Sequence, residues 1–237
     1  MIHFSVDDTI EVFENLTKGG YSSCFEEPTL AFFKKLHEQY GLKVTMYCFF
    51  ESDLGFCLAD ATSEFKDEFR ENSYWLRFGF HAYNSKSMYD EYAVDEFIAE
   101  TEKVYENLYR IVSSDSVGYD VRLGFAKGSI DCIKAFKKKY PLFETLYGAD
   151  DNRIEYYLSP SENDILLNDG SFYENNAGIC IRISELRLEI QTDISEYIRN
   201  LPQRDCYAFF THEPCFADEK TRKTMIDLCK WADEFVF

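Results

Sequence analysis

Short apolar segments alternate with longer segments of helical period along the whole chain, and this alternation constrains the fold more than any other feature. The apolar segments are rich in β-branched and aromatic residues, as in I-H-F-S-V at residues 2–6. After the first of them, Leu30, Phe33, Leu36 and Tyr40 recur at the spacing of one helix face. Such alternation is typical of βα units around a parallel sheet, so the sequence predicts an α/β fold.

Seven segments have the length and composition of strands, namely residues 2–6, 43–50, 75–80, 117–123, 142–147, 178–183 and 206–211. A chain of 237 residues is long enough to bury one sizeable core, and no linker or repeat divides it, so we expect a single domain over residues 1–237. The segment at about 150–173 breaks the alternation with Asp, Asn, Ser and Pro residues. Its turn signal, Asn168-Asp169-Gly170, predicts an inserted loop or small hairpin.

The composition of the chain restricts the classes of partner that it can bind and the cellular location that we expect. The 43 acidic side chains outnumber the 25 basic ones, and the formal net charge of −18 repels phosphate backbones and anionic lipid headgroups. We therefore expect neither nucleic acid nor membrane partners. No apolar run reaches the roughly 20 residues that cross a bilayer, no secretion signal follows Met1, and the eight cysteines form no C-x-x-C pair. These features predict reduced thiols and a cytoplasmic location, and they leave the oligomeric state open.

Titratable side chains stand in or directly after several of the predicted strands. In a barrel of parallel strands the carboxyl ends of the strands meet on one face, which is where such barrels hold their chemistry. We therefore expect one site. Its candidate residues are Asp7 and Asp8 after the first strand, His81 after the third, Arg122 in the fourth, Asp150 after the fifth and His212 after the last.

These segments resemble the motifs of the polysaccharide deacetylase family, the NodB-type domain of carbohydrate esterases. The S-V-D-D-T of residues 5–9 is similar to the family's T-F-D-D-G, and the K-V-T-M-Y of residues 43–47 to its K-A-T-F-F. Residues 77–81 stand where the family has E-I-G-x-H, residues 81–85 stand for its H-x-x-x-H metal motif, and residues 210–212 resemble its closing L-x-H. The resemblance covers most of the chain and implies a distorted, seven-stranded β/α barrel.

The resemblance also implies roles for the candidate residues. Asp7 corresponds to the general base, His212 to the general acid, and Asp8 and His81 to ligands of a divalent metal ion, for which zinc is the first choice. Ser85 replaces the second metal-binding His of the family, so Asn84, Ser85 or water would complete the metal shell. We expect Arg122 to orient Asp7, and Asp150 to orient His212.

The leading functional hypothesis is a hydrolase that removes an acyl group, with N-acetyl as first choice, from a carbohydrate by metal-assisted attack of water. The alternative is a barrel of the same family that has lost catalysis and binds carbohydrate with a weak metal site or none, because Ser85 is not a ligand of the family's kind. The third choice is a glycoside hydrolase that pairs Asp7 or Asp8 with Glu213.

Overall fold

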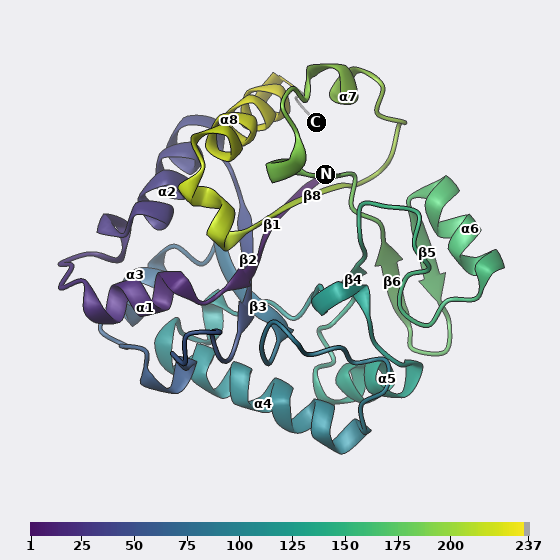
Figure 1. Ribbon diagram of the computed structural model, residues 1–237, viewed down its shortest axis with the longest axis horizontal. Helices are drawn as coiled ribbons and strands as arrows, with labels where there is room; N and C mark the ends of the chain where they lie inside the picture. Colours follow the sequence, from purple (N-terminus) through teal and green to yellow (C-terminus); the bar gives the residue numbers. More distant parts are fainter. Residues whose placement is uncertain (235–237) are drawn as a thin grey trace.

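The computed structural model describes residues 1–234, and its centre is a five-stranded parallel sheet (Figure 1). Parallel neighbours place the carboxyl ends of the strands at one edge, and the register sets Asp7 opposite His212. In spatial order the strands are β3 (Leu76–Ala82), β2 (Val44–Phe49), β1 (Ile2–Thr9), β8 (Tyr207–His212) and β7 (Leu186–Arg187).

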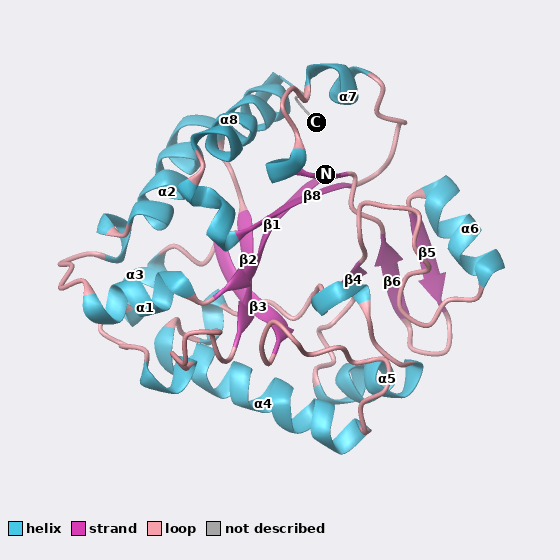
Figure 2. Cartoon of the chain, in the orientation of Figure 1, coloured by secondary structure: helices cyan, strands magenta, loops and turns pink. Residues whose placement is uncertain are grey.

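Helices surround the outer side of this sheet, and their apolar faces pack on it (Figure 2). The helices α2 and α8 lie side by side, as do α4 and α5. Large rings such as Trp75, Phe78 and Phe80 are fully buried between the sheet and these helices, and each contributes about 1.5–3 kcal/mol by leaving water. The helices are α1 (Glu11–Lys18), α2 (Pro28–Tyr40), α3 (Lys66–Glu71), α4 (Val94–Ile111), α5 (Ile130–Lys139), α7 (Ser195–Arg199) and α8 (Glu219–Glu234).

A second sheet of three strands stands beside the first and has the order β4-β6-β5. Strand β4 (Thr145–Tyr147) runs parallel to β6 (Ile179–Arg182), whereas β5 (Ser171–Glu174) runs antiparallel to it. Helix α6 (Pro160–Asp169) packs on β5. The α/β class and the parallel central sheet agree with the prediction from the sequence.

The expected seven-stranded barrel is not confirmed, because the described strands form two sheets. Six of the seven predicted segments contain a strand, but residues 117–123 make only isolated bridges, from Val117 to Phe78 and from Val121 to Leu146. Side chains take up backbone acceptors of this segment. The carbonyl oxygen of Gly118 accepts a hydrogen bond from Tyr105, and that of Arg122 accepts one from His81, so a continuous ladder does not form there.

The loop or hairpin expected at about 150–173 is replaced by a helix over most of its second half. Helix α6 begins with a capping box, in which Ser159 and Glu162 satisfy each other's backbone N–H groups, and Pro160 occupies the first turn. Gly170 ends it in the left-handed conformation with φ 79°. The signal at 168–170 is therefore the end of a helix, and the hairpin, β5–β6, lies after it.

Two expectations from composition can be compared with the structure. None of the helices in residues 1–234 has the length and apolar character needed to span a bilayer. All eight cysteines are unpaired: Cys24, Cys48, Cys132 and Cys229 are buried, and the other four are partly exposed.

Candidate active site

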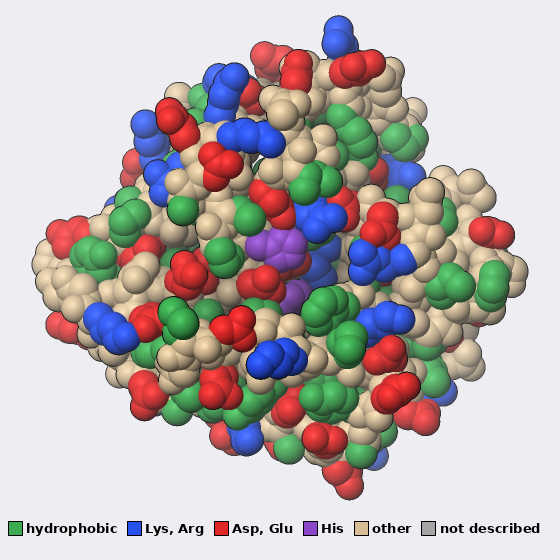
Figure 3. All heavy atoms as spheres, in the orientation of Figure 1, with side chains coloured by type: hydrophobic (Ala, Val, Ile, Leu, Met, Phe, Trp, Pro, Cys, Tyr) green, Lys and Arg blue, Asp and Glu red, His purple; other side chains and the backbone are tan. Residues whose placement is uncertain are grey.

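A cavity of about 240 Å³ opens at the carboxyl ends of the central strands. Histidine, arginine or lysine, and acidic side chains gather around a hollow on this face of the molecule (Figure 3). The structure brings all the candidate site residues from the sequence except Glu213 to this one cavity. The lining includes Asp7, Asp8, His81, Asn84, Ser85, Arg122, Asp150 and His212.

Asp7 is the buried carboxylate of the site. It is 1% exposed at the end of β1, and its Oδ2 lies 3.2 Å from Nε of Arg122. Burial raises the pKa of Asp7, although the Arg122 charge opposes this. Its Oδ1 is also buried and accepts no hydrogen bond from the described residues, so its acceptor capacity is unused.

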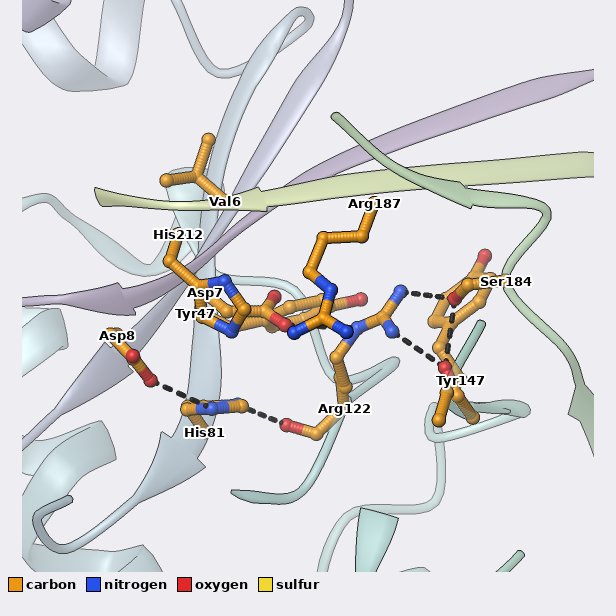
Figure 4. A network of polar contacts seen from close by, with 12 residues as sticks. Val6, Asp7, Asp8, Tyr47, His81, Arg122, Tyr147, Ser184, Arg187 and His212 are labelled. Carbon is orange, nitrogen blue, oxygen red and sulfur yellow. Dashed lines mark hydrogen bonds and ion pairs between the residues drawn. The ribbon is translucent and has the colours of Figure 1, made fainter. Parts of the chain in front are cut away.

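Arg122 is held rigidly beside Asp7. Its Nη1 donates to the carbonyl oxygen of Gly148 at 2.5 Å, its Nη2 donates to Oγ of Ser184 at 2.6 Å, and its guanidinium lies 4.0 Å above the ring of Phe210 (Figure 4). These contacts use the outer edge of the guanidinium and leave Nε facing the carboxylate. The expected contact between Arg122 and Asp7 is therefore present.

The side chain of Asp8 points away from that of Asp7, toward His81, because the backbone turns sharply at Asp8. A register shift interrupts the β1–β2 pairing between Val6 and Thr9, and Asp8 has the left-handed φ of 60°. Such a conformation costs a non-glycine residue about 1–3 kcal/mol and is found mainly at functional sites. The turn directs the Asp8 carboxylate toward His81, with Oδ1 at 3.2 Å from Nε2.

His81 is held from both sides of its ring. Its Nδ1 donates to the carbonyl oxygen of Arg122 at 2.6 Å, while Nε2 faces Asp8. Burial lowers the pKa of His81, but the hydrogen bond with Asp8 and the charge of Asp7 outweigh this and raise it. Burial raises the pKa of Asp8, but its interaction with His81 dominates and lowers it. Both shifts favour the charged forms of this contact, a carboxylate at Asp8 and an imidazolium at His81.

The donor set of the cavity does not match the divalent metal that the motifs imply. Asn84 Oδ1 accepts hydrogen bonds from Lys86 N–H and Ser87 Oγ, and Ser85 Oγ donates to Asp53 at 2.6 Å. Neither residue is therefore placed as the expected ligand. Within residues 1–234 no three His, Cys, Asp or Glu side chains are grouped to hold an ion. Catalytic zinc keeps three protein ligands, so the pair of Asp8 and His81 does not fit such a site.

His212 is the last residue of β8 and lines the cavity. Its Nδ1 lies 2.6 Å from Oε1 of Glu189, and Figure 4 shows the ring beside Asp7. Burial lowers the pKa of His212, but Glu189 reverses this and raises it. A carboxylate on Nδ1 stabilises the imidazolium and leaves Nε2 to deliver a proton.

The expected partner of His212 was Asp150, and this was wrong. Asp150 instead lies against Arg187, with its Oδ2 at 3.6 Å from Nε. The sequence carried only a partial signal for the true partner, because the E-L-R-L-E-I of residues 185–190 alternates as a strand does, whereas Glu189 lies in the 3-10 turn Leu188–Ile190 that follows β7. Strand β7 lies in this segment, which the sequence analysis did not count as a strand.

Glu213 is the other carboxylate proposed from the sequence, and it does not line the cavity. It is buried and accepts hydrogen bonds from the backbone N–H groups of Ile10, Glu11 and Val12 at 2.6, 2.6 and 2.9 Å. These groups form the first turn of α1. Glu213 is therefore a helix cap, and the carboxylate pair of a glycoside hydrolase is not assembled with it.

An aromatic side chain stands at the rim of the cavity. Phe125 is 53% exposed and has φ 60°, and Arg153 Nη1 donates to its carbonyl oxygen at 3.2 Å. Arg153 is itself paired with Asp151 at 2.7 Å. An exposed ring fixed at the rim of a polar cavity offers a flat apolar surface to a ligand.

No protein-family model and no curated protein matches the sequence. Among solved structures, the chain is similar to the Xyl-CE4 domain of a multidomain xylanase from the hindgut metagenome of Trinervitermes trinervoides, with 12% identity over 98% of this chain and 82% of that one and a TM-score of 0.52. A peptidoglycan N-acetylglucosamine deacetylase gives 10% identity, 98% and 79% coverage and a TM-score of 0.48. At such identities the likeness concerns the fold alone. Together with the motifs, it identifies the fold of this chain as a divergent NodB-like deacetylase fold.

Proposed function

We propose that the protein is a carbohydrate deacylase, which hydrolyses an acyl group, with N-acetyl as first choice, from a sugar. One observation carries the proposal: a buried carboxyl group with one oxygen that accepts no hydrogen bond from the described residues lies opposite an imidazole with a raised pKa in one cavity. These are the base and the acid that acyl hydrolysis requires. The motif resemblance and the fold support a carbohydrate as the substrate.

The base step belongs to Asp7. Its ionised carboxylate accepts a proton from water through Oδ1, while Arg122 holds the carboxylate through Oδ2. The resulting hydroxide oxygen adds to the acyl carbon, and the carbonyl electron pair moves to the acyl oxygen. Burial raises the pKa of Asp7 and favours the protonated acid, and the Arg122 charge opposes this rise and favours the ionised base.

The acid step belongs to His212. When the tetrahedral intermediate collapses, the bond from the acyl carbon to the sugar nitrogen or oxygen breaks, and His212 Nε2 protonates the leaving atom. Glu189 stabilises the imidazolium before the transfer and orients the ring through Nδ1. No step is assigned to a metal ion here, because the pair of Asp8 and His81 does not make up a catalytic metal site.

The proposal is tested by acetate release from N-acetylated chitooligosaccharides and from acetylated xylooligosaccharides. We expect the wild-type protein to release acetate and Asp7→Asn to lower kcat by at least about 10², the lower end of the range for a general base. The matched control is Asp164→Asn, because Asp164 is an exposed aspartate on α6.

The other outcomes of this assay distinguish the alternatives. Sugar that binds without any acetate release would favour the non-catalytic carbohydrate-binding barrel. The hydrogen bond between Ser85 and Asp53 is consistent with this alternative, because it engages the residue that stands in place of a metal ligand. New reducing ends without acetate would indicate a glycoside hydrolase. Either result would contradict the deacylase proposal.

A further inference from the structure

One guanidinium in the cavity has no part in the steps above. Arg187 comes from β7, where it lies in register with Phe210 of β8, two residues before His212. Residues two apart on a strand share a face, so Arg187 and His212 project to the same side of the sheet. Figure 4 shows its side chain directed toward Arg122, Asp7 and His212.

Arg187 differs from Arg122 in having unused hydrogen-bond donors. Within residues 1–234 its Nε has no hydrogen-bond partner, no residue accepts from either Nη atom, and its one ion pair is the 3.6 Å contact with Asp150. Both Nη atoms of Arg122, by contrast, donate hydrogen bonds, and its Nε, which also lacks a hydrogen-bond partner in this part of the chain, lies 3.2 Å from Oδ2 of Asp7. A guanidinium carries five N–H donors in a rigid fork, so Arg187 offers an anion-binding edge to the cavity.

The proposed reaction creates an anion next to this edge. When water adds to the acyl carbon, negative charge develops on the acyl oxygen, and fixed donors aimed at that charge commonly make the largest contribution to catalysis. Asp8 and His81 do not complete a metal site that would carry this charge, and their own charges are paired with each other. Because Arg187 lines the same cavity as the base and the acid, its guanidinium faces the space where the reaction would take place.

We propose that Arg187 binds the acyl oxygen of the substrate and stabilises the tetrahedral oxyanion, an inference that rests on the proposed deacylase function. The hydroxide adds to the acyl carbon, and the oxygen that receives the carbonyl electron pair faces the guanidinium. On collapse this oxygen forms the carbonyl again, the bond to the sugar atom breaks, and His212 supplies its proton. Arg187 keeps all its protons, and Asp150 is a positioning residue that orients it.

The first test is a kinetic comparison of Arg187→Gln with the wild-type protein on the acetylated sugar that is turned over fastest. Loss of one oxyanion donor lowers kcat by about 10²–10³, and we expect KM to change little because the charge exists only in the transition state. Low millimolar guanidinium chloride should restore part of kcat in Arg187→Ala. The control is Arg70→Gln, whose arginine is paired with Asp67 on α3.

The second test measures binding without turnover. A methylphosphonamidate of glucosamine has a tetrahedral, anionic phosphorus in place of the acyl carbon, and calorimetry should show that Arg187→Gln binds it about 10²-fold or more weakly than wild type while N-acetylglucosamine binds equally. Equal phosphonamidate affinity, an effect on KM alone, or failure of guanidinium rescue in a folded Arg187→Ala protein would overturn the inference. Failure of the proposed function is distinct, since it appears as no acyl release by the wild type.

Discussion

At the scale of single residues, the pH dependence of the site is set by Asp7 and His212. Turnover requires ionised Asp7 and protonated His212. Burial raises the pKa of Asp7, so activity should begin to rise above the usual aspartate range. Burial lowers the pKa of His212, but the hydrogen bond with Glu189 outweighs this and raises it. The imidazole therefore stays protonated to a higher pH than a free imidazole does. The pH profile of kcat/KM should therefore be bell-shaped, with both its acid limb and its alkaline limb shifted to higher pH.

Glu189→Gln tests this assignment. The amide carries no charge, so the imidazolium of His212 loses its stabilising partner and its pKa falls. We expect the alkaline side of the kcat/KM profile to move down by about one pH unit or more, the usual size of the effect of a close opposite charge. The acid side should stay in place. An unchanged alkaline side, with Glu64→Gln as the exposed control, would mean that Glu189 does not govern the acid.

At the scale of elements, the connection from β1 to α1 carries both aspartates of the site. Glu213, from the turn that follows β8, accepts three backbone N–H groups at the start of α1. These groups lack partners within the helix, and a carboxylate also interacts favourably with the positive end of the helix dipole. Through these hydrogen bonds, Glu213 connects the end of β8 to the start of α1, which directly follows the turn at Asp8.

We expect Glu213→Gln to weaken this connection. One of the two carboxylate oxygens becomes an NH₂ group that cannot accept, so at least one buried N–H loses its partner, at about 1–3 kcal/mol of unfolding free energy. Because α1 follows Asp7 and Asp8 directly, kcat should fall as well. Urea unfolding and acetate release measure the two effects, and wild-type values in both would contradict the role of the cap.

Ser159→Ala is the comparison at the same scale. It removes the capping box of α6, which packs on the second sheet, and such a loss costs about 1 kcal/mol. Stability should fall while kcat is retained.

At the scale of the whole molecule, one buried carboxyl group without a countercharge contact affects stability. Glu155 is 0% exposed, its Oε1 accepts from Ala149 N–H at 3.0 Å, and its Oε2 has no partner among the described residues. Burial raises its pKa from 4.5 to about 7. The folded protein therefore binds this proton more tightly than the unfolded chain.

The sign of the effect follows from proton linkage. Between pH 4.5 and about 7 the folded state holds the Glu155 proton that the unfolded chain has lost, so stability decreases as pH rises through this window and levels off above it. The difference in pKa corresponds to about 3 kcal/mol. Glu155→Gln should remove this part of the decrease when urea unfolding at pH 5 is compared with pH 8. Identical decreases in variant and wild type would contradict it.

Sequence patterns alone predicted six of the strands, several of the helices and the side chains that stand at strand ends. Both properties are local, because the apolar period reports the buried face of a segment and the end of a strand lies at the sheet edge. That is why Asp7, Asp8, His81, Arg122 and His212 could be assigned to one site, and the structure brings them to one cavity. The sequence also contains local signals for α6 and β7, in the capping-box residues Ser159 and Glu162 and in the alternation that begins at residue 185.

The partners of those side chains, in contrast, depend on how the separate elements pack against one another. Glu189 rather than Asp150 meets His212, Glu213 caps α1, Ser85 bonds to Asp53, and residues 117–123 give their carbonyl groups to side chains instead of to a barrel ladder. Each of these contacts joins residues far apart along the chain, over distances of a few ångströms that depend on register and rotamer. No periodicity encodes such a distance, because it is set when separate elements pack against one another.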